Sequence, residues 1–337
     1  MKQIYLFLLI LVVNFSFSQN LVDNPSFEKG MCPKDYSQIM YARGWKGFSS
    51  DYFKSCPKEE KYLTKKMSTP ENSQGYQKPR TGIAYAGLVT PKELLQTKLM
   101  ESLKKDSIYY VEFFVNLSDS SSYAIWDIGV YLSNISFDYN WGSDIYDTII
   151  PQIRNPKDRY LTNTILWTKI SGFYKAKGNE KYLTISSFNK SSSQEIKEAL
   201  IIDKNRNRKR YYYIDDVYIG NVPKKLTYTI HSINYKTNEY TLQSETYDQF
   251  DIIVDYLQKE QGINILIKGF TDNVGNEDEN INLSNQRAIE IKNYLIKKGI
   301  DENRINTIGM GSLFPISKNN TREGRQENRR IEISFGI

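Results

Sequence analysis

Apolar and polar residues alternate along most of the chain between residues 20 and 221. In YYVEFFVNL, residues 109–117, every second residue from Val111 to Leu117 is apolar, whereas Glu112 and Asn116 fall on the opposite face. The stretches IGVYLS, WTKISGFY, KYLTISSF and YYYIDDVYIG repeat this pattern between segments rich in Gly, Asn, Ser and Lys. Many short strands without long helices predict an antiparallel sandwich or jelly roll. One short helix is expected, in PKELLQTKLMESL at residues 91–103.

The periodicity changes after NVPKKL, residues 221–226. SETYDQFDIIVDYLQKE has apolar residues at helical spacing behind Ser244, a good N-cap. INILIKGF at residues 263–270 predicts a strand, LSNQRAIEIKNYLIKKG at 283–299 an amphipathic helix capped at Gly299, and RRIEISF at 329–335 a closing strand. The predicted fold class is therefore two domains, an all-β jelly-roll sandwich at 19–221 followed by a small α+β domain at 227–337, joined by a linker at 222–226.

Residues 1–18 have the features of a secretory signal peptide. Lys2 precedes an apolar core, IYLFLLILVV, and small residues stand before Gln19. This core is shorter than the roughly 20 residues that span a bilayer, although a retained anchor helix is the alternative. No cysteine follows the cleavage site, so lipid attachment there is not expected. In an exported protein the two cysteines, Cys32 and Cys56, favour one disulfide over two isolated thiols.

Composition limits the chemistry that the chain can perform. The net charge of +6 is a mild excess over 337 residues and does not argue for nucleic acid. His231 is the single histidine, and no HExxH, GxSxG, CxxC or phosphate-loop pattern occurs. We therefore expect no enzymatic activity. A glycan hydrolase on the jelly roll is the enzyme alternative, because its paired carboxylates come together only in the fold.

One acid and one base stand out in GFTDNVGNEDENINLSNQRA, residues 269–288. Asp272 follows the predicted strand, and Arg287 stands three residues after Ser284, which would place it in the first turn of the next helix. Both charges then meet at one rim, where Asp272 binds an ammonium group and Arg287 grips a carboxylate with its bidentate fork. The alternative is that Asp272 caps its own turn and Arg287 is solvated.

These residues, with GMGSLFP and NNTREGRQENRRIEI, follow the order and spacing of the OmpA-like peptidoglycan-binding domain, which the last 110 residues or so resemble. The resemblance implies that Asp272 and Arg287 hold the meso-diaminopimelate of the peptidoglycan stem peptide. It also brings Thr271, Asn273, Asn280, Asn328 and Arg329 into the candidate site, with turn formation as the alternative for the first three. Arg330 is expected in a structural ion pair. Phe270 and Ser312 depart from the residues that the family often has.

The amino-terminal half resembles galactose-binding-like, carbohydrate-binding jelly-roll modules, through NLVDNPSFEKG, GYQKPRTGIAYAGL and YYYIDDVYIG. Such a module in front of an OmpA-like domain is common in exported Bacteroidetes OmpA family proteins. The resemblance implies a structural calcium ion between Glu28 and Asp216, with loop hydrogen bonds as the alternative. The aromatic residues of loop-like stretches are candidates for a sugar-stacking surface, with the core as the alternative: Trp45, Tyr52, Phe53, Tyr76 and Tyr85.

Taken together, the sequence predicts a non-catalytic envelope protein, exported to the periplasm and associated with the outer membrane and peptidoglycan. Its expected partners are peptidoglycan, through the carboxyl-terminal domain, and a glycan or an outer-membrane protein, through residues 20–221. The expected cofactors are none, apart from the calcium ion that the resemblance implies. A wall-anchored scaffold of an outer-membrane or secretion complex is the alternative function.

Overall fold

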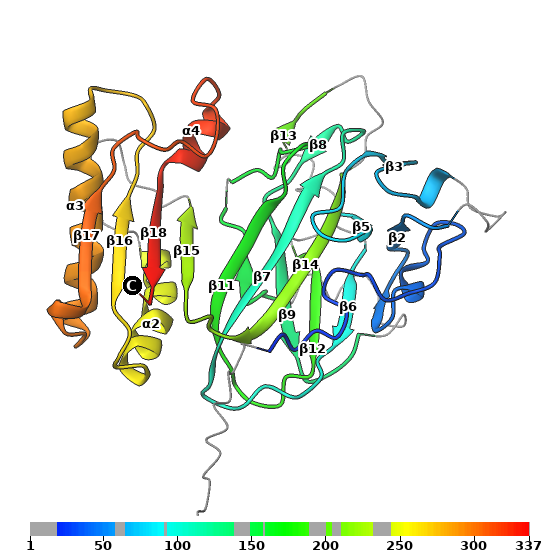
Figure 1. Ribbon diagram of the computed structural model, residues 1–337, viewed down its shortest axis with the longest axis horizontal. Helices are drawn as coiled ribbons and strands as arrows, with labels where there is room; N and C mark the ends of the chain where they lie inside the picture. Colours follow the sequence, from blue (N-terminus) through cyan, green and yellow to red (C-terminus); the bar gives the residue numbers. More distant parts are fainter. Residues whose placement is uncertain are drawn as a thin grey trace, which may run out of the picture.

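The computed structural model describes residues 19–57, 65–90, 93–137, 149–157, 159–188, 200–203, 210–231 and 244–336 (Figure 1). The predicted signal at residues 1–18 lies outside these ranges. The described part divides into a mostly β amino-terminal region and a smaller carboxyl-terminal region that carries the long helices, side by side in Figure 1.

The amino-terminal region contains two five-stranded antiparallel sheets that share one hydrophobic core. In spatial order, the first sheet comprises β1 (Trp45–Gly47), β6 (Leu95–Lys98), β12 (Tyr182–Ser187), β9 (Ile128–Ser133) and β10 (Ile153–Arg154). The second comprises β11 (Thr168–Lys175), β7 (Ile108–Leu117), β14 (Tyr211–Asn221), β5 (Ala84–Val89) and β2 (Asp51–Lys54). The alternating apolar residues of β7, from Val111 to Leu117, lie in the shared core, as the sequence pattern predicts.

Short elements complete this region: η1 (Ile39–Tyr41), η2 (Lys65–Met67), the hairpin of β3 (Glu71–Asn72) and β4 (Gly75–Tyr76), and the pair β8 (Tyr123–Ala124) and β13 (Leu200–Ile201). The helix expected at residues 91–103 is wrong, because Leu95–Lys98 form strand β6 between β1 and β12. Leu95, Gln96 and Thr97 are all buried, so pairing with two neighbouring strands overrides the local helical pattern.

The carboxyl-terminal region has a four-stranded sheet in the order β15 (Leu226–His231), β18 (Arg330–Phe335), β16 (Ile265–Gly269) and β17 (Ile305–Gly309). Its helices are α2 (Ser244–Lys259), α3 (Glu277–Lys297), the single turn η4 (Glu302–Arg304) and α4 (Arg322–Asn328). Strands β16 and β17 are parallel, so α3 is the crossover between them. Ile331, Ile333 and Phe335 lie in the core on one face of β18, which confirms the predicted pattern.

Helix α3 begins earlier than the sequence pattern suggested. Its N-cap is Asn276, whose side chain accepts a hydrogen bond from the backbone N–H of Glu279, and the first turn is entirely acidic. Asn is a preferred N-cap, and carboxylates in the first turn interact favourably with the positive end of the helix dipole. Both effects stabilise a helix that begins at Glu277. The predicted end holds, since Gly299 adopts a positive φ of 93° directly after the last turn.

A second hydrophobic core joins the two regions. It combines Ile108, Tyr110 and Phe173 of the amino-terminal sheets with residues of α2, α3 and all four carboxyl-terminal strands. The ring of Phe173 lies 5.0 Å from that of Tyr228 and 5.6 Å from that of Phe335, centre to centre. The outer face of β7 and β11 is therefore covered by the carboxyl-terminal region, and the two regions pack directly against each other.

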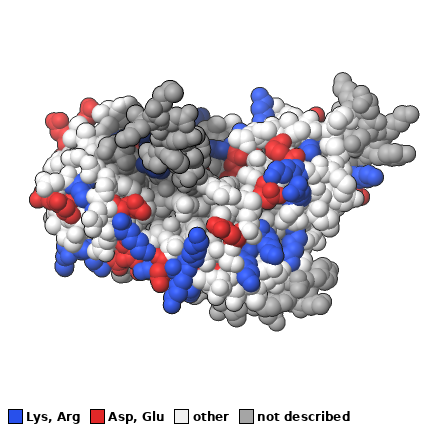
Figure 2. Space-filling model, turned by 60° about the horizontal axis from the view of Figure 1, so that its bottom comes forward, with Lys and Arg blue, Asp and Glu red and all other residues white. Residues whose placement is uncertain are grey.

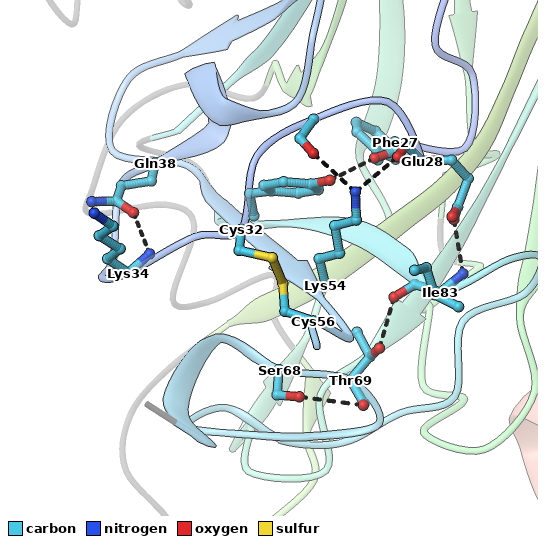
Figure 3. Close-up of a disulfide and its surroundings, with 12 residues drawn as sticks. Phe27, Glu28, Cys32, Lys34, Gln38, Lys54, Cys56, Ser68, Thr69 and Ile83 are labelled. Atoms are coloured by element: carbon cyan, nitrogen blue, oxygen red, sulfur yellow. Dashed lines mark hydrogen bonds between the residues drawn. A yellow bond between two sulfur atoms is a disulfide. The ribbon is translucent and has the colours of Figure 1, made fainter. Parts of the chain in front are cut away.

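A disulfide and a mixed surface charge are further features of the fold. Cys32 and Cys56 form a disulfide that ties the loop after Gly30 to the end of β2, as predicted (Figure 3). On the face shown in Figure 2, basic and acidic side chains of the described residues are interspersed, in keeping with the mild net charge. Among the described residues, the helices are too short or too polar to cross a membrane.

Candidate functional site

The candidate site lies where strand β16 ends and helix α3 crosses it. A Cβ atom at Gly269 would lie 2.0 Å from the carbonyl oxygen of Ser284, so only glycine permits this close approach. The chain then continues to Asp272, which is 8% exposed. Its Oδ1 atom accepts a hydrogen bond from the backbone N–H of Val274, at 3.0 Å, and its Oδ2 atom pairs with the Arg329 guanidinium, at 2.5 Å.

Arg287 lies in the third turn of α3, because the helix begins at Glu277. The expectation that it stands in the first turn, beside free backbone N–H groups, is therefore wrong. Instead it belongs to a buried stripe with Asn280 and Ser284, at the spacing of residues that share one helix face. Long helical side chains point back toward the N-terminus, which directs Arg287 toward the end of α3 that covers residues 269–274.

The other two members of that stripe shape the loop around Asp272. Asn280 donates a hydrogen bond from its Nδ2 atom to the carbonyl oxygen of Val274, at 3.1 Å. The Ser284 hydroxyl accepts one from the backbone N–H of Gly311, at 2.9 Å. Gly311 in turn accepts the backbone N–H of Thr271. The acid is thus held by α3 and by the loop after β17 together.

Thr271 and Asn273 flank Asp272 and differ in exposure. Thr271 is 5% exposed, and its Oγ1 atom has no hydrogen-bond partner among the described residues. Buried hydroxyls are usually hydrogen-bonded, so this oxygen is available to a ligand. Asn273 is exposed to solvent next to it.

Asn328 holds a loop. Its Oδ1 atom accepts hydrogen bonds from the backbone N–H groups of Ile316 and Ser317, and its Nδ2 atom donates to Ser317 and Asn319. All four hydrogen-bonding positions of the fully buried amide are used, so the predicted direct ligand contact is corrected to a supporting role.

Arg330, the next arginine after Arg329, has the structural ion pair that the sequence predicts. Its Nε atom lies 2.7 Å from Glu332, and its guanidinium stacks 3.6 Å from the ring centre of Phe270. This cation–π contact gives the departure at Phe270 a physical reason.

Comparison with known protein families gives a match in the same part of the chain: residues 234–329 match the model of the OmpA family. The carboxyl-terminal part of the chain is an OmpA-family domain. Outer membrane protein A of Bordetella avium is 52% identical over 71 residues, which is 21% of this chain and 37% of that protein. Peptidoglycan-binding protein ArfA of Mycobacterium tuberculosis is 42% identical over 87 residues, 26% of this chain and 27% of the relative.

A third relative, probable lipoprotein YiaD of Escherichia coli, is 46% identical over 67 residues, 20% of this chain and 31% of the relative. The chain thus spans about a third of the length of these relatives. The family model covers residues 234–329, so the amino-terminal region lies outside the matched family range.

The residues implied as calcium ligands come together without forming a metal site. Glu28 accepts hydrogen bonds from the backbone N–H groups of Ile83 and Ala84, at 2.9 and 3.0 Å. The Lys54 ammonium donates to the carbonyl oxygens of Glu28 and Gly30, so a cation already occupies this turn (Figure 3).

The second implied ligand is also engaged. Asp216 pairs with Arg80 and accepts the hydroxyl of Thr81. Within the described ranges, no group of three or more His, Cys, Asp or Glu side chains is placed to hold a metal. Both Asp216 oxygens and the Glu28 Oε1 atom already accept N–H or O–H donors. The cationic side chains of Arg80 and Lys54 lie beside them, so the residues present do not favour a hard cation such as calcium.

The suggested sugar-stacking surface is also corrected. Trp45, Tyr52, Phe53 and Tyr85 are buried, and only Tyr76, at 50%, is well exposed. Phe53 and Tyr85 belong to a small aromatic cluster on the outer side of the β14–β5–β2 sheet, in which Tyr85 donates its hydroxyl to the carbonyl oxygen of Gln77. Burial of large aromatic rings in the fold accounts for these residues.

One charged cluster was missed by sequence reasoning. Arg159, which follows β10, is 5% exposed and forms two hydrogen bonds to Glu327 of α4, at 2.6 and 3.0 Å. The His231 Nδ1 atom lies 3.4 Å from the same carboxylate. Burial would raise the pKa of Glu327, but Arg159 and its neighbours lower it to about 2. Arg159 and Glu327 are 168 residues apart, and no local pattern announces the pair.

Proposed function

We propose that this protein is a non-catalytic cell-envelope protein whose OmpA-family domain binds peptidoglycan non-covalently. The ligand is the free amino acid centre of diaminopimelate in the stem peptide, with its ammonium on Asp272 and its carboxylate on Arg287. The name of the M. tuberculosis relative, a peptidoglycan-binding protein, supports this assignment. The observation that carries it is the buried Asp272 carboxylate, held on the loop that the Arg287 face of α3 covers.

The acceptor capacity of Asp272 supports ammonium binding. A carboxylate has about four acceptor positions. One donor reaches each oxygen, Val274 on Oδ1 and Arg329 on Oδ2. An ammonium group can therefore bind without displacing Arg329, and the Thr271 hydroxyl stands beside it as a further partner. Asn273 and Asn280 complete the proposed site as the exposed flank and the loop support.

The proposed organisation follows from this role. Residues 1–18 form a signal peptide, 19–221 a jelly-roll module related to carbohydrate-binding modules, and 227–337 the peptidoglycan-binding domain after a linker at 222–226. The protein is exported and lies in the periplasm, associated with the outer membrane through its partners. Relatives named as outer membrane protein and lipoprotein support this location.

The test is a pull-down of the mature protein with insoluble peptidoglycan that contains diaminopimelate. Asp272→Ala and Arg287→Ala should each weaken binding roughly ten- to a hundredfold, because each removes a charge-assisted hydrogen bond. Asp278→Ala and Arg322→Ala, at exposed positions of the same domain, are matched controls and should bind normally. Equal binding by all five proteins would show diffuse charge attraction and overturn the clamp.

A second polymer separates the two halves of the clamp. Peptidoglycan with lysine in place of diaminopimelate keeps the ammonium group but lacks the carboxylate. The wild type should therefore bind this polymer about as weakly as the Arg287→Ala variant binds the diaminopimelate polymer. Release of soluble fragments during the assay would contradict the non-catalytic assignment.

The amino-terminal module is proposed to bind a protein partner, which makes the chain a wall-anchored scaffold. The burial of Trp45, Tyr52, Phe53 and Tyr85 favours a protein over a glycan. Immobilised full-length protein should retain a solubilised outer-membrane protein and should not retain oligosaccharides. Retention of oligosaccharides alone would reverse the choice between the two partners.

A further inference from the structure

The OmpA-family domain receives a charged side chain from the segment that follows β10 in the amino-terminal region. Helix α4 lies on the side of the domain that faces these sheets (Figure 1). There Arg159 grips Glu327 with its Nε and Nη2 atoms, one on each carboxylate oxygen. Such bidentate pairs fix direction as well as distance, because the guanidinium and carboxylate must share a plane.

Arg159 is itself held rigidly by its own region. Its Nη1 atom donates to Asn155 Oδ1, at 2.9 Å. Asn155 is fully buried and donates from Nδ2 to the carbonyl oxygens of Trp126 and Arg159, at 2.7 and 2.6 Å. These hydrogen bonds fix the orientation of the Arg159 guanidinium toward α4.

Three successive residues at the end of α4 point to three different partners. Glu327 bonds Arg159, Asn328 holds the loop at residues 316–319, and Arg329 pairs with Asp272. The backbone N–H of Arg329 still donates to the carbonyl oxygen of Arg325, so Arg329 continues the helical turn. A shift or rotation of α4 therefore moves the Arg329 guanidinium relative to Asp272.

We propose that Arg159 is a positioning residue for the peptidoglycan site: it fixes α4 through Glu327 and so keeps Arg329 in place on Asp272. This inference rests on the proposed function. If Arg159 has this role, the amino-terminal region supports the ligand site. It contributes Arg159, the first residue in the series of contacts Arg159–Glu327–Arg329–Asp272. Interactions of this kind commonly tune binding from residues that never touch the ligand.

The experiment is a double-mutant cycle on the full-length protein. The probe is a soluble disaccharide tripeptide that ends in diaminopimelate, with affinity measured by titration calorimetry. Arg159→Ala should weaken binding between roughly 2- and 30-fold, the range typical of coupling through a supporting residue. In an Arg329→Ala background the same substitution should have less than about a twofold effect, because the residue through which it acts is gone.

Two further variants separate positioning from general loosening of the domain contact. Lys175 pairs with Asp255 at 2.6 Å across the same contact but away from α4, so Lys175→Ala is the matched control and should leave binding unchanged. Arg159→Lys, which keeps the charge and loses the fork, should give an intermediate affinity. If Arg159→Ala fails to fold, Glu327→Gln replaces it in the cycle, with the same expectation.

The outcomes distinguish this inference from the function on which it rests. Binding by the wild type together with unchanged binding by Arg159→Ala, or with an equal loss in both Arg329 backgrounds, overturns the positioning role alone. An equal loss in Lys175→Ala does the same. Absence of binding by the wild type overturns the proposed function, and the positioning role with it.

Discussion

One imidazole should make a destabilising contribution to the fold on acidification from pH 8 to pH 5. His231 is the only histidine of the chain and lies at the end of β15, 12% exposed, against Glu327. Burial lowers its pKa, and so do the cations Arg159, Arg330 and Lys169, whereas the Glu327 carboxylate raises it. Burial and the cations prevail, and the pKa of His231 falls to about 3.

The sign and size follow from proton linkage. In the unfolded chain the pKa of histidine is about 6.5, the value found in model peptides. At pH 5 the unfolded state therefore binds a proton that the folded state refuses, so the stabilisation is complete above about pH 6.5 and is lost toward pH 3. The contribution of His231 to the free energy of unfolding falls by about 1.4 kcal/mol per pH unit in this window, or about 2 kcal/mol by pH 5.

Two carboxyl groups act in the opposite sense over the same range. Burial raises the pKa of Glu93 to about 8, and burial with the nearby Asp216 charge raises that of Asp215 to about 8. Their folded forms take up protons on acidification and gain stability. Both groups are also present in a His231→Gln variant, so the difference between the two proteins isolates the imidazole.

The assay is urea denaturation of the wild type and of His231→Gln at pH 8 and pH 5. From pH 8 to pH 5 the wild type should lose about 2 kcal/mol relative to the variant. The single imidazole resonance of the folded protein should not titrate in this interval by proton NMR. If Glu327 dominated instead, the wild type would gain stability relative to the variant, and the resonance would titrate above pH 6. Either result refutes the balance of burial over ion pairing.

Further substitutions test other parts of the argument. Phe173→Ala should lower the free energy of unfolding by about 3–5 kcal/mol, measured by urea denaturation, because this buried ring joins the two regions. Replacing Cys32 and Cys56 together by serine should cost about 3 kcal/mol for a separation of 24 residues, and a reductant should not destabilise that variant further. Thr271→Val should change thermal stability little, since its hydroxyl has no partner within the described ranges, yet weaken binding of the disaccharide tripeptide; unchanged affinity would remove Thr271 from the site. Gly269→Ala should cost about 1–3 kcal/mol through its clash with Ser284, and an unchanged melting temperature would contradict the close approach.

The elements that sequence predicted well are those whose pattern reflects a single buried face. Strand β18 shows the reason: Ile331, Ile333 and Phe335 alternate with polar residues because one side of the strand faces the core. Helix α2 is similar, since Phe250, Ile253, Val254 and Leu257 recur at helical spacing and are all buried. The pairing of Cys32 with Cys56 also follows from composition, because a chain with two cysteines has one way to join them.

The errors arise where a distant neighbour decides the structure. The stretch at residues 91–103 suggested a helix, but β1 and β12 flank Leu95–Lys98 and make it a strand. The position of Arg287 was misjudged because the acidic start of α3 was assigned to a loop. The local sequence pattern could not predict the burial of Tyr52 and Tyr85 for a similar reason. A sequence shows that an aromatic ring is present, but not which strand covers it. The pair of Arg159 and Glu327 is the extreme case.

The covered outer face of the second sheet links fold and function. In a two-sheet sandwich the outer face is ordinarily wet and polar. Strand β7 departs from this, since Ile108 and Tyr110 are buried on its outer side against the OmpA-family domain. The connection between β14 and β15 therefore needs only residues 222–225, because the domain is held by its contact rather than by a flexible tether. In Figure 1 the OmpA-family domain lies at one end and the disulfide-tied β2 edge at the other. The direct packing of the two regions thus fixes the direction in which that distant edge points relative to the OmpA-family domain.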